Sequence, residues 1–432
     1  MNEHRVNMQR LQHAVWGSGS RKEAKCVAKL VVDPSPVAGH VSVALEDRLL
    51  LVWGGYYVVH PGLPARDDKY RDPSLLYVYH TDQEKWLTFQ TGGQVPPENS
   101  GCCGVLAGGS LYIFGGFVHH SSSGSNDLYK LDLLSLTWHR LQPSTALCPT
   151  PRHKLVGWEY RHKLYFFGGF GPPPHSIIGD GAYLDGEGSF VIDALLTYVS
   201  AWNNQLVEFD LMQNCWSLTK CKGDRPSPRA AHSVVKMGYD RVLVFGGRHR
   251  DRRLNDLFLL KLTTITWIQI TVQSDAVPSG RSWHSMSALP DHRFLLYGGF
   301  SETNQPLGDC WVLAASEDAW LWQRRSEWEQ GKGRLWHTGV SVGDLVFIYG
   351  GCQSNILDAS EHREYHKDLV VLPPRPRPLM QLCALQLTAV GFKLNKSAPW
   401  LPDHLSRQMQ FKLSKQVNKK LYLQSVFDLL SL

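Results

Sequence analysis

Several features of other protein classes are missing from this chain. It has no apolar run of the roughly 18–20 residues that a membrane-spanning helix needs. Its charged first 25 residues contain no signal-peptide core. From these absences we expect a protein of the nucleus and cytoplasm with no membrane partner.

Metal-binding and catalytic patterns are also lacking. The nine cysteines form no Cys-x-x-Cys pair, so we expect free thiols and neither disulfides nor structural zinc. The adjacent Cys102 and Cys103 lack the spacing of zinc ligands. His232, His284 and His337 recur at one position of an internal repeat, and we interpret them as hydrogen-bonded structural residues. No Ser/His/Asp set or phosphate-binding loop is visible, so we expect no cofactor and no enzymatic activity.

The chain before its C-terminal part lacks a net positive charge. The formal net charge is +6. Residues 375–432 hold nine Lys or Arg against two Asp, a balance of +7, which leaves −1 for the residues before them. No nucleic-acid-binding module accompanies this basic tail. We therefore interpret its charge as a solvated helix face and expect no nucleic-acid partner.

What the chain does contain is an internal repeat. Six Gly-Gly pairs, at 54–55, 115–116, 168–169, 246–247, 298–299 and 350–351, each end a short run rich in β-branched and aromatic residues. A second apolar stretch and a Trp follow each of the first five pairs, at Trp86, Trp138, Trp216, Trp267 and Trp320. A period of about 50 residues is typical of kelch propeller blades. The predicted fold class is therefore all-β, a six-bladed kelch β-propeller followed by a short C-terminal α-helical segment.

The repeat boundaries divide the chain into three parts. We expect residues 1–25 to be a flexible leader, residues 26–372 to form the propeller, and residues 373–432 to form a Pro-rich linker with helices. The sixth unit ends at this linker, before the outer strand and Trp that the other units have. The apolar segment 26–33 has no other sheet to join, so we predict that it supplies this outer strand to the last blade.

Two short motifs follow the linker. Residues 378–387 (PLMQLCALQL) resemble the box that binds Elongin C, and residues 401–409 (LPDHLSRQM) are similar to the box that selects Cullin-2. Their contact positions are Leu379, Cys383 and Leu387 in the first box and Leu401, Pro402 and Leu405 in the second. The resemblance implies Elongin C, Elongin B and Cullin-2 as partners.

With these boxes, residues 26–410 resemble the kelch substrate receptors of Cullin-2 ubiquitin ligases, the family of kelch domain-containing protein 2. The segments SPRAAH, FGGRHRDRRLNDL, GRSWHS and RLWHT carry the resemblance best. It implies a non-catalytic receptor for substrate proteins whose C-terminal degron ends in diglycine. It assigns the degron carboxylate to Arg248, Arg253 and Ser282. It assigns the walls of the peptide channel to Lys154, Phe170, Trp202, Trp283 and Trp336.

The residue types suit this chemistry. A planar guanidinium group matches a carboxylate in two parallel hydrogen bonds. Arg248 directly follows a Gly-Gly pair, at a strand end that should open on the loop face of the propeller. The family has Tyr where this chain has Phe170, which implies one hydrogen bond fewer to the peptide backbone and a different affinity or selectivity.

Two other function classes remain open at this point. A plain kelch scaffold that binds a folded partner or the cytoskeleton would make the two tail boxes coincidental. A kelch-propeller enzyme, such as a copper oxidase, would need metal ligands on the axial face, and the sequence shows no such set. Co-purification with Elongin B and C separates the receptor from the scaffold, and metal analysis tests the enzyme.

Overall fold

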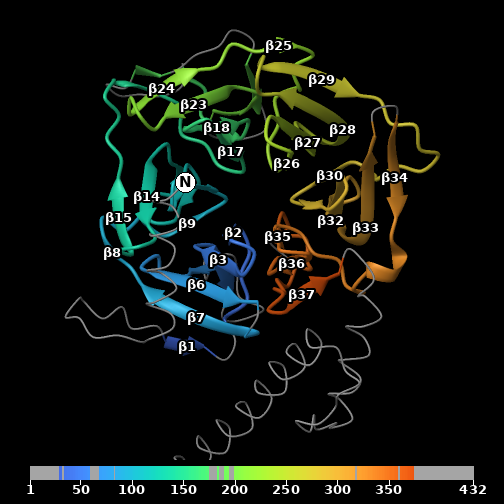
Figure 1. The fold of residues 1–432 in the computed structure, drawn as a ribbon, viewed down its shortest axis with the longest axis horizontal. Helices are drawn as coiled ribbons and strands as arrows, with labels where there is room; N and C mark the ends of the chain where they lie inside the picture. The colour runs from blue at the N-terminus through green and yellow to red at the C-terminus, as the bar shows by residue number, and fades with distance from the viewer. Residues whose placement is uncertain are drawn as a thin grey trace, which may run out of the picture. The chain divides into compact units, whose positions relative to one another are not determined.

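A computed structural model of the 432-residue chain describes residues 29–31, 34–58, 68–81, 83–174, 182–183, 189–193, 199–316, 319–358 and 361–373. The chain divides into two compact units, Met1–Pro374 and Arg375–Leu432. In the first unit, six β-sheets stand around one axis and the chain visits them in order (Figure 1). No helix in the described part is long and apolar enough to cross a membrane. The six-bladed propeller is confirmed, whereas the predicted leader and C-terminal helices lie outside the described residues.

Each blade is an antiparallel sheet whose first strand lies nearest the axis (Figure 1). Blade 1 contains β2 (Val41–Leu45), β3 (Leu49–Trp53), β6 (Leu75–His80) and β7 (Lys85–Gln90), and blade 2 contains β10 (Cys103–Ala107), β11 (Ser110–Phe114), β14 (Leu128–Asp132) and β15 (Thr137–Arg140). Blade 3 contains β17 (Val156–Tyr160), β18 (Lys163–Phe167), β23 (Leu206–Asp210) and β24 (Cys215–Leu218), and blade 4 contains β26 (Ser233–Met237), β27 (Arg241–His249), β28 (Arg252–Lys261) and β29 (Thr266–Ile270). Blade 5 contains β31 (Ser285–Leu289), β32 (Arg293–Ser301), β33 (Pro306–Ala315) and β34 (Trp320–Arg324), and blade 6 contains β35 (Thr338–Val342), β36 (Leu345–Tyr349) and β37 (Leu369–Leu372).

Shorter elements extend the blades or lie in their connections. The strands β8 (Gly92–Gly93) and β25 (Lys222–Gly223) run parallel to β15 and β29. The remaining short elements are β4 (Tyr56–Val58), β5 (Asp68–Tyr70), β9 (Asn99–Ser100), β12 (Phe117–Val118), β13 (Ser123–Gly124), β16 (Leu147–Cys148), β19 (Phe170–Gly171), β20 (Ala182–Tyr183), β21 (Phe190–Asp193), β22 (Ser200–Asn203), β30 (Arg281–Ser282) and the 3-10 turn η3 (Ser326–Trp328).

Aromatic pairs hold neighbouring blades together. The residue before each Gly-Gly pair is aromatic, and at five of the six seams its ring packs on the outer-strand Trp of the next blade at centroid distances of 4.8–5.4 Å. The five pairs are Trp53–Trp138, Phe114–Trp216, Phe167–Trp267, Phe245–Trp322 and Tyr349–Trp86. The repeat therefore encodes the core between blades, because each unit supplies one ring to each of its two seams.

Two details of this aromatic pattern were not predicted. In blade 5 the packed residue is Trp322, so the assignment of Trp320 as the repeat Trp is wrong. The turns of the two blades are equally long, but β33 and β34 continue for one more residue pair beyond the packed Trp than β28 and β29 do. At the seam between blades 5 and 6, Trp328 from η3 packs against the buried cluster that contains Tyr297. A residue that precedes blade 6 thus takes the place of the Trp that its missing outer strand would carry.

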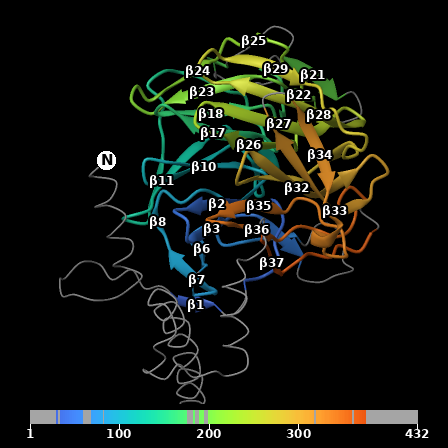
Figure 2. The same ribbon diagram turned by 45° about the vertical axis from the view of Figure 1, so that its right-hand side comes forward.

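The prediction that segment 26–33 completes the last blade is wrong. Its described strand β1 (Lys29–Val31) runs antiparallel to β7 at the outer edge of blade 1 (Figures 1 and 2). Within the described residues β37 pairs only with β36. Blades 1 and 6 both offer an open outer edge, and a short apolar strand satisfies the backbone groups of either one. Its composition therefore did not determine which edge it joins.

The ring closes instead through contacts that repeat those of the other seams. His40 Nε2 and Thr338 Oγ1 share a hydrogen bond of 2.8 Å between blades 1 and 6. His284 with Ser233 and His337 with Ser285 make the same contact at 2.8 and 3.0 Å. Gly351 N–H also donates to the Val37 carbonyl at 2.7 Å. Residues 34–40, rather than β1, therefore complete the ring.

Candidate functional site

One residue of each blade lies at the axis, and the six are joined in a closed ring of backbone hydrogen bonds. Each N–H donates to the carbonyl of the equivalent residue in the preceding blade at 2.7–3.2 Å, and each φ lies between 53° and 66°. In chain order these axial residues are Gly39, Gly101, Lys154, Ala231, Trp283 and Trp336. The fold thus dictates their backbone, whereas their side chains differ from blade to blade.

The position of the Trp336 side chain at the axis depends on two axial glycines. A Cβ on Gly39 or Gly101 would stand 3.1–3.2 Å from the indole of Trp336. Ala231 has a similar left-handed φ and a side chain, so the backbone conformation alone does not require glycine there. The two glycines therefore leave room for Trp336, whose ring stacks on Trp283 at a centroid distance of 5.5 Å.

A second ring of equivalent positions follows the Gly-Gly pairs. Each of these residues faces the residue that precedes an axial residue, as Arg248 faces Ala230 in an antiparallel bridge. The six residues are Tyr56, Phe117, Phe170, Arg248, Phe300 and Cys352. Arg248 is the one charged member, just as Lys154 is the one charged axial residue.

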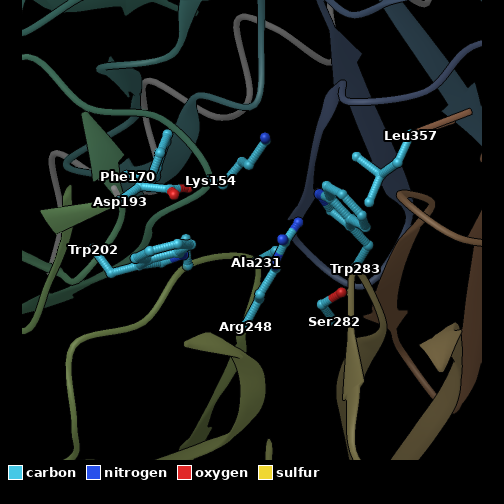
Figure 3. A pocket seen from close by; sticks show the side chains of 10 residues that line it. Lys154, Phe170, Asp193, Trp202, Ala231, Arg248, Ser282, Trp283 and Leu357 are labelled. Carbon is cyan, nitrogen blue, oxygen red and sulfur yellow. The ribbon is translucent and has the colours of Figure 1, made fainter. Parts of the chain in front are cut away.

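These two cationic residues border one cavity of about 210 Å³. Blades 3 to 6 contribute its lining residues, which are Lys154, Phe170, Asp193, Trp202, Ala230, Ala231, Arg248, Ser282, Trp283 and Leu357. Figure 3 shows the Arg248 guanidinium group pointing into the space between Trp202 and Trp283, with the Ser282 hydroxyl beside it. The cavity therefore combines aromatic walls with a group of polar side chains at its base.

The hydrogen bonds around the base leave donors available to the cavity. Arg248 Nε–H donates to the Arg250 carbonyl at 2.7 Å, which fixes the guanidinium plane and leaves the two terminal amino groups for a ligand. Arg253 Nε–H donates to Ser282 Oγ at 3.2 Å, so the Ser282 hydroxyl accepts from protein and has its own hydrogen to donate. The second anchor of Arg253 is Asn304 Oδ1, at 3.0 Å.

The base of the cavity gathers cationic side chains that repel one another. Burial, followed by the Arg248 charge, lowers the pKa of Lys154 from 10.5 to about 8. Burial, followed again by the Arg248 charge, lowers the pKa of Arg253 from 12.5 to about 10. Lys154 Nζ also lies 5.3 Å from the centre of the Trp283 ring. The resulting cation–π interaction favours the charged form of Lys154. An anion bound among these groups would relieve their mutual repulsion.

A small sheet forms the wall on the blade 3 side. In it β22 pairs with both β19 and β21, which places Trp202 opposite Phe170 and opposite Val191. Paired residues of neighbouring strands share a face, so Phe170 and Trp202 both face the cavity. Their rings lie 5.0 Å apart. Two residues further along the strands, Asp193 pairs with Ser200.

The structure places the predicted site residues in three relations to the cavity. Six of them line it, namely Lys154, Phe170, Trp202, Arg248, Ser282 and Trp283. Arg253 is not in the lining but donates a hydrogen bond to Ser282. Trp336 is not in the lining either, and its ring contacts Trp283 and Lys154. The predicted Elongin C and Cullin-2 box residues lie outside the described residues.

Sequence reasoning missed four residues of the lining. Ala230 and Ala231 belong to the repeat segment SPRAAH, and their place at the axis follows from the repeat pattern. Asp193 and Leu357 lie in long connections whose lengths differ from blade to blade. No spacing rule applies to such connections, so the sequence carried no signal for these two residues.

Histidine and cysteine side chains near the axis do not gather into a metal site in the described part of the chain. Among the described residues there is no group of three His, Cys, Asp or Glu side chains placed to hold a metal ion. Burial and the Arg281 charge lower the pKa of His284 to about 3, so this histidine is neutral and serves the blade seam. His232 is buried and packs edge-on against Phe167.

Comparisons with known proteins are consistent across family, relatives and fold. The family model for the KLHDC2/KLHL20/DRC7 Kelch-repeats domain matches residues 39–186 and 190–376. Human "Kelch domain-containing protein 2" is 35% identical over 382 residues, covering 86% of this chain and 89% of the relative. Mouse "Kelch domain-containing protein 1" is 30% identical over 384 residues, covering 87% and 90%. The solved structure of YjhT, with a TM-score of 0.55 and 17% identity over 79% of this chain and 96% of its own, shows the fold alone.

Proposed function

Since this chain belongs to the KLHDC2/KLHL20/DRC7 kelch-repeat family, we propose that its propeller is a receptor for the C-terminal carboxylate of substrate proteins ending in diglycine. One observation carries the proposal. Lys154, Arg248 and Ser282 each have a hydrogen-bond donor to offer to a single cavity of about 210 Å³. A free chain terminus supplies the anion that such a set of donors requires.

The walls explain why glycine would be preferred at the end of the bound chain. Trp202 and Trp283 are 5% and 6% exposed, so their surroundings hold them in place, and both line the cavity. A ligand that passes between them on its way to Arg248 has little room for side chains. Glycine residues also adopt the backbone conformations that a narrow passage demands.

The proposed role is that of a non-catalytic substrate receptor in a Cullin-2 ubiquitin ligase. The motifs at 378–387 and 401–409 support this role, because they resemble the boxes for Elongin C and Cullin-2 and follow the propeller directly. The propeller would bind the substrate, Elongin B and Elongin C would link it to Cullin-2, and the ligation chemistry would take place on other subunits. The nucleus and cytoplasm are the compartments we propose.

The carboxylate proposal is tested by calorimetry with an acetylated peptide that ends in Gly-Gly. The free acid should bind, and amidation of its terminus or the change Arg248→Ala should each weaken binding roughly tenfold to hundredfold, because each removes one side of a charge-assisted hydrogen bond. Leu134→Ala, an exposed change in the turn between β14 and β15, serves as the control. Equal binding of acid and amide would contradict the proposal.

A plain scaffold function is the second candidate. The Leu134, Met212 and Tyr239 side chains are 42%, 81% and 65% exposed and offer apolar contacts outside the cavity. This function predicts partners whose binding survives Arg248→Ala. Binding partners recovered with the wild-type protein and with that variant therefore separate the two candidates.

A further inference from the structure

Asp193 is the one acidic side chain among the residues that line the cavity. Its carboxylate points into the cavity from the blade 3 wall, whereas Arg248 rises from blade 4 and Trp283 stands on the far side (Figure 3). The carboxyl end of a bound chain has no use for this acidic group. Two carboxylates repel each other, so a part of the ligand other than its carboxyl end would lie beside Asp193.

Strand register shows how far Asp193 lies from the base. The pair Asp193–Ser200 comes two residues after the pair Val191–Trp202 on the same face of the sheet. β22 begins beside Val199, which is 50% exposed, and ends at Asn203, which is 1% exposed and donates to the Gly169 carbonyl. Asp193 thus lies on the solvent side of Trp202.

The same spacing can be translated into ligand residues. Two residues of an extended strand span about 6.6 Å, and an extended peptide advances by the same amount. A chain that ends at Arg248 with its glycines beside Trp202 and Trp283 would bring its third or fourth residue from the end level with Asp193. These positions are the first ones upstream of the diglycine whose side chains the protein could recognise.

We propose that Asp193 makes this receptor prefer substrates with a Lys or Arg immediately upstream of the terminal glycines. The inference rests on the proposed function. The terminal carboxylate of the same ligand would offset part of the positive charge of Lys154 and Arg248 and so lower their repulsion of such a side chain. Asp193 is half-buried, and an ion pair there is screened less than one on the open surface.

The hairpin of blade 4 offers the opposite charge. Arg250 and Arg252 at its tip are exposed and are not part of the cavity lining, whereas Asp193 is. If the hairpin decided selectivity, acidic upstream residues would be favoured instead. The sign of the preference therefore distinguishes the two features.

The test compares acetylated peptides that end in Gly-Gly and carry Lys, Ala or Glu at the third or fourth position from the end. At one of these positions, wild-type protein should bind Lys over Glu by roughly threefold to tenfold, as one partly exposed ion pair allows. Asp193→Asn should remove this ratio, and Asp193→Lys should reverse it. Asp251→Asn makes the same charge change at an exposed residue outside the cavity and should leave the ratio unchanged.

The outcomes separate this inference from the proposed function. If the Ala peptide binds equally well as acid and as amide, the proposed function fails. If the acid binds and the amide does not, but Lys and Glu peptides bind alike or Glu is preferred, only the role of Asp193 is overturned. Melting temperatures of both Asp193 variants exclude misfolding as the cause, and the wild-type comparison needs no variant at all.

Discussion

At the scale of single residues, the site depends on one charged residue in each of two rings of equivalent positions. One ring is formed by the axial residues, and the other by the residues that follow the Gly-Gly pairs. Five residues that follow the Gly-Gly pairs are uncharged, and the sixth is Arg248. Five axial residues are uncharged, and the sixth is Lys154. Both charged residues line the same cavity. The repeat therefore fixes where these residues lie, and their charges make the cavity cationic.

Lys154 gives the first prediction at this scale. With a pKa of about 8, it is charged below that pH and loses its charge as the pH rises through 8. The affinity for an acetylated Gly-Gly peptide should therefore fall roughly tenfold between pH 7 and pH 9. In Lys154→Arg the charge persists over this range, so the fall should disappear. Calorimetry at the two pH values measures it, and an unchanged fall in the variant would exclude Lys154 as the titrating group.

At the scale of elements, the blade seams rather than the outer strands carry the ring. Each seam joins an aromatic ring before a Gly-Gly pair to an aromatic ring from the next unit or from η3. Between blades 1 and 6, Val37 and His40 add hydrogen bonds to blade 6. By contrast β1 makes only three residue pairs with β7, at the outer edge of blade 1.

Two N-terminal deletions test this difference. Removal of residues 1–33 should lower the melting temperature by only a few degrees, because three edge pairs contribute little net free energy. Peptide affinity should stay the same. Removal of residues 1–40 should prevent stable folding, since it also removes Val37, Gly39 and His40 from the seam. A similar melting temperature for both deletions would show that residues 34–40 do not close the ring.

At the scale of the whole molecule, recognition and assembly are assigned to different units. The cavity lies within Met1–Pro374, and both proposed partner boxes lie within Arg375–Leu432. The Pro-rich segment that begins at Pro373 separates them in sequence. We therefore expect the two functions to be separable by truncation.

A chain that ends at Pro373 should keep its melting temperature and its affinity for a Gly-Gly peptide but lose Elongin C. In the full chain, Leu379→Ala should abolish Elongin C capture, because loss of a packed interface anchor costs about 2 kcal/mol or more. Calorimetry and pull-down with purified Elongin B and C measure the two properties. Undiminished capture by Leu379→Ala would remove the box assignment, whereas loss of peptide binding by the truncated chain would contradict the separation.

Much of this architecture was predictable from the sequence, because repetition leaves a local and periodic signal. The six Gly-Gly pairs gave the number of blades, and Arg248, which follows the fourth pair, lies in the lining of the cavity. The family resemblance assigned Arg248, Lys154 and Ser282 to one site, and the structure places all three in the lining of one cavity.

Only the tertiary structure decided those features for which the repeat is irregular or for which the sequence is compatible with two arrangements. Segment 26–33 suited either of two open edges, and one additional residue pair between β33 and β34 moved the packed ring from Trp320 to Trp322. Asp193 reached the cavity through a connection that is longer than its counterparts in the other blades. The sequence by itself thus determined a six-bladed ring with charged residues near its axis, because strand periodicity is a short-range property. The edge that β1 joins and the acidic wall of the cavity depend on contacts between segments distant in sequence, which no local pattern records.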